Sequence, residues 1–195
     1  AGSEIHGDLY VAANSVKIDQ DAIIDGNIYI TASSITLNGQ ITGSVYVTAS
    51  EFTMNYFTYI ARDLFLNTQN ATLSGVVYRN AFITADGNVK ATSDFRVSNN
   101  LVVNSALDFS FSGEVQGNAK INAQNLHFNK DENTLCTIKG NLEYGTQKET
   151  SVPDGIVAGS VSTFKYEDKI SHKVSIKSII LSLLTLLVYV LGVVI

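Results

Sequence analysis

The chain has 195 residues, a net charge of −5 and one cysteine, Cys136. Charged residues make up only 16% of it, and no basic stripe precedes residue 165, so the sequence predicts no nucleic-acid partner. A single cysteine excludes an internal disulfide framework and a thiolate metal cluster. The chain begins at Ala1 rather than at a methionine, and we expect it to be an excerpt of a precursor whose signal peptide was removed.

A repeat dominates residues 7–145, after a lead-in of residues 1–6. The segments GDLYVAANSVKI, GNIYITASSITL, GSVYVTASEFTM and GNAKINAQNLHF align without gaps from Gly7, Gly26, Gly43 and Gly117. Looser copies begin at Arg62, Arg79, Asn99 and Gly140, and successive starts are 17 to 23 residues apart. Such a period predicts an all-β parallel solenoid in which each repeat forms one coil and stacks on the next.

Each column of the alignment predicts one part of a coil. The second position carries Asp, Asn or Ser, which favour a turn, and the apolar third and fifth positions predict a strand with one buried face. The seventh position is small, from Ala13 to Thr146, and suits an inward corner. A second alternating pair follows, then a short third side around Ile23, Ile41 and Val76. Three sides predict a triangular β-helix of about seven to eight coils, right-handed because strands twist that way.

Two regions depart from the pattern. In the coil that starts at Arg79, Asn88 and Lys90 stand where the second apolar pair belongs, so we expect a bulge near Asp86 and Gly87. After Asn129 the pattern loosens into a protruding loop, and residues 146–177 are predicted to form the remnant of the last coil, a polar linker and a basic juxtamembrane segment.

The GNhYhTASxhTh repeats, in which h is an apolar residue, resemble the bactofilin or polymer-forming cytoskeletal family over residues 5–145. The resemblance implies a β-helix that assembles end to end without nucleotide. It points in particular to the membrane-anchored branch, in which a signal peptide precedes the β-helix and transmembrane helices follow it. Here a linker and an anchor follow the C-terminal end at once, which argues against continuous filaments.

Residues 178–195 form an uncharged run of 18 residues that would cover about 27 Å as a helix. The solenoid core is already filled by its own strands, so we predict a transmembrane helix rather than a core helix. Four lysines precede it at four-residue spacing and are placed to meet anionic headgroups: Lys165, Lys169, Lys173 and Lys177. Positive-inside counting puts the solenoid in the cytoplasm, whereas the family architecture puts it outside. We expect a cell-membrane location with the solenoid on the extracytoplasmic side.

No catalytic, cofactor or metal site is predicted. None of His6, His127 and His172 shares a coil with residues that would complete a catalytic triad or a zinc site. His127 lies between the inward residues Leu126 and Phe128 and should face solvent. We expect that the protein is not an enzyme.

Two interaction surfaces are predicted. An outward column of aromatic residues on five successive coils is either a stacking device or a docking face for a second solenoid or a glycan: Tyr10, Tyr29, Tyr46, Phe65 and Phe82. The first coil has almost no cap, so its apolar residues are expected to pair with the same coil of another molecule: Ile5, Leu9, Val11, Val16 and Ile18.

These patterns favour a membrane-anchored scaffold that self-associates. The alternative is a surface adhesin that binds glycan through the same aromatic residues, and a third possibility is a degraded carbohydrate-active β-helix. The expected partners are a second copy, membrane lipid and envelope glycan or membrane proteins.

Overall fold

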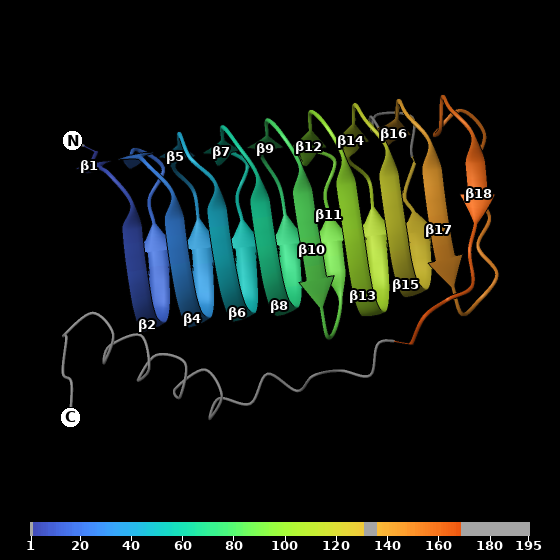
Figure 1. The fold of residues 1–195 in the computed structure, drawn as a ribbon, viewed down its shortest axis with the longest axis horizontal. Coiled ribbons are helices and arrows are strands. Elements are labelled where there is room, and N and C mark those ends of the chain that lie inside the picture. The colour runs from blue at the N-terminus through green and yellow to red at the C-terminus, as the bar shows by residue number, and fades with distance from the viewer. Residues whose placement is uncertain (1, 131–135, 169–195) are drawn as a thin grey trace, which may run out of the picture.

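The structure is a computed structural model that describes residues 2–130 and 136–168. In these residues the chain winds into an all-β parallel solenoid of about eight turns (Figure 1). The short strands build one sheet: β1 (Glu4–His6), β3 (Ile23–Asp25), β5 (Gln40–Ile41), β7 (Tyr59–Ile60), β9 (Val76–Val77), β12 (Arg96–Val97), β14 (Glu114–Val115) and β16 (Thr137–Ile138).

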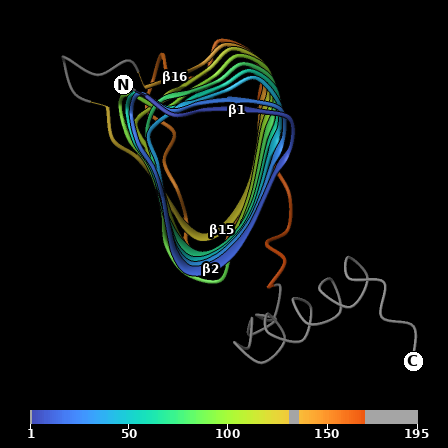
Figure 2. The same cartoon turned by 90° about the vertical axis from the view of Figure 1, so that its left-hand side faces the viewer.

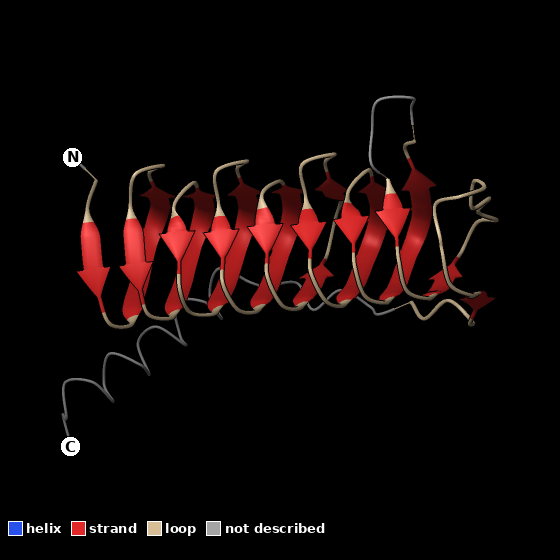
Figure 3. Ribbon diagram, turned by 90° about the horizontal axis from the view of Figure 1, so that it is seen from above, coloured by secondary structure: helices blue, strands red, loops and turns tan. Residues whose placement is uncertain are grey.

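The long strands build a second sheet that bends around one corner. It contains β2 (Leu9–Ile18), β4 (Ile28–Leu37), β6 (Val45–Met54), β8 (Leu64–Leu73), β10 (Ala81–Ala85), β11 (Val89–Ala91), β13 (Leu101–Phe111), β15 (Ala119–Phe128), β17 (Leu142–Thr146) and β18 (Val161–Thr163). All of these strand pairs are parallel, so each strand lies beside the same strand of the next coil. Figure 3 shows the row of short strands side by side in front of the long ones.

The register confirms the predicted repeat. The third-position column pairs coil by coil through the whole sheet: Leu9, Ile28, Val45, Leu64, Ala81, Leu101, Ala119 and Leu142. The column then continues to Val161, which pairs with Leu142 beyond the boundary expected at residue 145. The segment from Gly159 to Val161 therefore acts as one more repeat start.

The cross-section is a rounded triangle (Figure 2). Viewed from the N-terminal end, the chain passes along β1, turns down into β2 and moves clockwise as it recedes, which is the right-handed sense (Figure 2). The small column fills the corner inside each long strand, and Ala32, Ala49 and Ala123 there are at most 3% exposed. Larger side chains would not fit where the two sides of the sheet converge.

The third side differs from the prediction by one residue in two coils. Ile24 and Val77 point into the core and are at most 2% exposed, whereas Ile23 is 38% exposed. At both places two adjacent residues are apolar, so the alternation of apolar and polar residues could not predict which one faces inward. Ile41 is buried as predicted.

Hydrogen bonds hold the turn column in register. The side-chain Oδ1 of each Asn or Asp accepts a bond from the backbone N–H one coil further on, as between Asn27 and Ser44 (2.9 Å), Asn100 and Asn118 (2.9 Å) and Asn118 and Asn141 (2.8 Å). The preceding glycines allow the coils to approach closely, because a Cβ at Gly43 would lie 2.3 Å from the carbonyl oxygen of Gly26. The turn residues therefore fix the spacing between coils.

The irregularity predicted near Asp86 and Gly87 is confirmed. Residues 86–88 separate β10 from β11, and Val89 and Ala91 fill the inward positions one residue late. A second insertion of one residue lies in the next coil, where the register shifts between Ser105 and Asp108.

Candidate functional site

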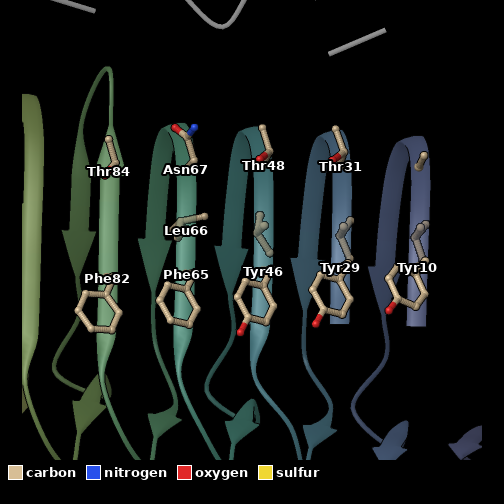
Figure 4. Close-up of a pocket in the computed structure, with 14 residues that line it drawn as sticks. Tyr10, Tyr29, Thr31, Tyr46, Thr48, Phe65, Leu66, Asn67, Phe82 and Thr84 are labelled. Carbon is tan, nitrogen blue, oxygen red and sulfur yellow. The ribbon is translucent and has the colours of Figure 1, made fainter. Parts of the chain in front are cut away.

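The predicted aromatic column forms a row of stacked rings on one long side of the triangle (Figure 4). Neighbouring ring centroids are 4.7 to 5.0 Å apart and the ring planes differ by at most 10°. Parallel rings in direct contact are about 3.5 Å apart. Because the centroids are further apart than this, each ring is shifted sideways relative to its neighbour. Each ring thus covers part of its neighbour's face: Tyr10 at the end of the row is 64% exposed, whereas Phe65 and Phe82 are 36% and 37% exposed.

A groove runs beside these rings along the solenoid axis, with a volume of about 510 Å³. We call it the aromatic groove. Tyr10, Tyr29, Tyr46, Phe65 and Phe82 form one rim, and Ala12, Thr31, Thr48, Asn67 and Thr84 form the other. None of these ten residues is charged. The pKa of Tyr29 is raised by desolvation beside the row, and the neighbouring tyrosines Tyr10 and Tyr46 add to the shift.

The same two columns continue into the C-terminal coils, where residues 164–168 lie across them. The Phe164 ring packs over Gly145, where a Cβ would lie 2.5 Å from it, and the Lys120 ammonium lies 5.0 Å from the ring centroid. Asn122 donates a hydrogen bond to the carbonyl oxygen of Glu167 (2.9 Å) and accepts one from its N–H (3.2 Å). The described segment after β18 turns back toward the N-terminal coils (Figure 1). Its contacts with Gly145 and Asn122 place it on the columns that form the aromatic groove further along the solenoid.

Within the described residues, the N-terminal end of the solenoid is open. Leu9, Val11 and Val16 are only partly buried, whereas their counterparts in the second coil are at most 2% exposed. The N–H of Leu9 donates to Asn27 of the next coil (2.8 Å). Backbone groups alternate in direction along a parallel strand, so those of Tyr10 and Ala12 point away from the second coil. Among the described residues no strand lies on that side of β2.

The predicted end residues line one hollow of about 570 Å³: Ile5, Leu9, Val11, Val16 and Ile18. Ile5 is 37% exposed and Ile18 is 7% exposed, so these residues differ widely in how much surface they present to solvent. Residues 2–25 contain five acidic residues and one lysine, which gives this end a net charge of −4. The acidic residues are Glu4, Asp8, Asp19, Asp21 and Asp25.

The C-terminal end is covered by its own chain. Ile156 closes the core at 1% exposure, and Leu142 beneath β18 is fully buried. The Tyr144 hydroxyl donates to the carbonyl oxygen of Thr150 (3.3 Å), which holds the segment after β17 across the end. The two ends of the solenoid are therefore unlike.

In residues 2–130 and 136–168 no three His, Cys, Asp or Glu side chains are placed so that they could hold a metal ion. His6 lies 3.6 Å from Glu4 and 3.8 Å from Asp25 at the surface, and His127 is exposed as predicted. Burial raises the pKa of the Cys136 thiol to about 11.

The predicted membrane residues fall mainly outside the described part. Lys165 is exposed. Lys169, Lys173, Lys177 and residues 178–195 lie outside the described residues. Within the described ranges there is no helix long and apolar enough to cross a membrane.

The chain matches no protein-family model, no curated protein and no solved structure. The strand topology shows a β-solenoid fold.

Proposed function

We propose that this chain is a membrane-anchored structural scaffold of the bactofilin type, which pairs with a second copy through its N-terminal end and uses neither nucleotide nor catalysis. The observation that carries the proposal is the difference between the two ends. Within the described residues, the N-terminal end leaves the edge of the ten-residue strand β2 and a partly buried apolar coil open, whereas at the C-terminal end Ile156 closes the core and only the three-residue strand β18 presents an edge. Repeat proteins normally cover both ends, because an open strand edge recruits other strands.

Pairing of two open ends gives a closed dimer. The same surface would serve both copies through a two-fold axis, with β2 antiparallel to β2 of the second copy. The backbone groups of Tyr10 and Ala12 supply the hydrogen bonds, and Leu9 and Val11 lose their remaining exposure. The covered C-terminal end does not extend the assembly, so dimers rather than long filaments are expected.

The membrane anchor of the proposal is the uncharged run 178–195, and the basic residues before it are proposed to meet anionic lipid. The extracytoplasmic placement of the solenoid rests on the family resemblance. Protease added to intact cells tests this placement, because it should cleave an extracytoplasmic solenoid without lysis of the cells.

Proline substitution at the two ends of the full chain in detergent micelles tests the pairing. Ala12→Pro removes an N–H that points away from the second coil, so it breaks no internal ladder bond. Thr163→Pro is the matched control in β18: the neighbouring Phe164 N–H donates to Tyr144 (3.0 Å), so the Thr163 N–H points outward. Wild type and Thr163→Pro should sediment as dimers and Ala12→Pro as a monomer. A monomeric wild type, or a dimeric Ala12→Pro, would overturn the proposal.

Glycan binding in the aromatic groove is the second candidate. Three tyrosine hydroxyls beside a row of threonines give the groove the mixed apolar and hydrogen-bonding character that sugars need. The offset stacking argues against it, because sugar rings bind to open aromatic faces and these faces are partly covered. Titration with soluble envelope oligosaccharides, observed as shifts in tyrosine NMR signals, separates this function from the scaffold.

A further inference from the structure

The aromatic groove has no charge, unlike the other two sides of the solenoid. Over the same five coils, the outward positions of the other long side include Lys17, Glu51 and Lys90. The short side carries Glu4 and Asp25. Over these five coils the outward columns of this side therefore expose aromatic and small polar groups, and this stretch can leave bulk water without desolvating a charge of its own.

The chain leaves the solenoid on this side. Phe164 and Glu167 are fixed to Gly145 and Asn122, which belong to the column that forms the threonine rim of the groove. Asn122 is only 6% exposed, so this attachment is anchored in the solenoid rather than in a surface loop. Tyr166 and Glu167 reach Thr84, the residue at which the open groove begins. The last described residues thus lead into the groove.

The distance to the apolar run is short. Nine residues separate Asp168 from residue 178, and a fully extended chain of that length reaches about 30 Å. If residues 178–195 span the bilayer, the attachment point on β15 and β17 is held within that reach of the membrane. The nearest side of the solenoid is then the one that carries the aromatic groove.

The rings are suited to such a surface. Tyrosine is enriched where the bilayer meets water, because its ring is apolar and its hydroxyl is polar. Figure 4 shows the hydroxyls of Tyr10, Tyr29 and Tyr46 on the same side of the row, so all three present the same polar edge. The opposite rim offers the hydroxyls of Thr31, Thr48 and Thr84 and the amide of Asn67.

We propose that the aromatic groove lies against the headgroup region of the membrane, so that the solenoid rests on the bilayer with its axis parallel to the surface. This inference rests on the proposed membrane anchor. The anchored solenoid is thereby oriented, with its two charged sides facing water. Residues 164–168, which attach the following chain to the solenoid, determine which side faces the membrane.

Spin labels on two threonines of one strand test the orientation. Thr48 and Thr53 both lie on β6 and both point outward, but Thr48 lines the aromatic groove and Thr53 lies on the other long side. Thr48→Cys and Thr53→Cys are each labelled in the full chain and placed in phosphatidylcholine vesicles. Collision rates with oxygen, which dissolves in lipid, and with a water-soluble nickel chelate are then compared. Wild type serves as the labelling blank because Cys136 is 1% exposed.

The expected result is a several-fold higher ratio of oxygen to nickel collisions at Thr48→Cys than at Thr53→Cys. Equal nickel access at both sites would overturn the inference. Protection of Thr48→Cys from both reagents would also overturn it, because protein rather than lipid would then cover the groove. Release of the chain from the vesicles by alkaline carbonate is scored separately, since that result defeats the anchor itself.

Discussion

Phe65 and Phe82 form a matched pair that measures what ring stacking contributes to the solenoid. Both are phenylalanines on interior coils, and they are 36% and 37% exposed. Phe65 has a stacked ring on each side, Tyr46 at 4.8 Å and Phe82 at 5.0 Å. Phe82 stacks on Phe65, and the next residue in its column is Val102.

Replacement of either residue by alanine removes the same buried apolar area, so the difference between the two variants reports one stacked contact. A stacked aromatic pair contributes about 0.5–1.5 kcal/mol beyond its buried area. We therefore expect Phe65→Ala to lower the free energy of unfolding by about 1 kcal/mol more than Phe82→Ala does.

Urea unfolding of the full chain in mild detergent, followed by far-ultraviolet circular dichroism, gives both values, and equal m-values are required for the comparison. The double variant completes a cycle whose coupling energy should equal the stacking contribution. Equal losses from the two single variants, or a coupling energy near zero, would refute the reasoning and leave the row as a set of independent side chains.

Further predictions concern the core, the turns and the open end. At pH 8 the buried Cys136 thiol should stay protonated, because its pKa is raised to about 11, and it should react with maleimide only after unfolding. Gly43→Ala should lower the urea midpoint by an amount equivalent to about 1–3 kcal/mol, because its Cβ would lie 2.3 Å from the Gly26 oxygen. Asn100→Ala should cost about 1 kcal/mol in the same assay, because the Asn118 N–H loses its acceptor, and Asn100→Asp should cost less. The dimer should tighten as salt rises from about 20 to about 300 mM in sedimentation experiments, because two ends of charge −4 meet.

The sequence predicted the coils because stacking forces each residue to meet its own counterpart one repeat later. Leu9, Ile28 and Val45 occupy one column for this reason, and the register follows directly from the alignment. The alternation of apolar and polar residues did not predict the inward residue where two apolar residues are adjacent, as at Ile23 and Ile24. The second insertion was not predicted: Leu107 is 43% exposed, and Phe109 is buried one residue later than the regular register would place an inward residue.

The candidate surfaces were predicted only in part. The outward aromatic column follows from the alternation of inward and outward residues along each strand. The repeat pattern could not predict the contact between Glu167 and Asn122. This contact joins residues 45 positions apart through a side-chain amide and a backbone peptide group. The sequence contained one indication of this contact. Gly145 has no side chain, whereas the equivalent residues of coils five to seven are polar: Thr84, Asn104 and Asn122.

The two proposals together restrict the symmetry of the dimer. An end-to-end pair has its two-fold axis at the N-terminal edge, perpendicular to the solenoid axis. If that axis lay in the membrane plane, the second copy would turn its aromatic groove and its anchor away from the bilayer that holds the first. Both copies reach one membrane only if the axis is the membrane normal. The first halves of the two β2 strands then lie side by side, and the two aromatic rows meet at Tyr10. The exposure of Tyr10, 64% at the end of a row of stacked rings, is what such a meeting point requires.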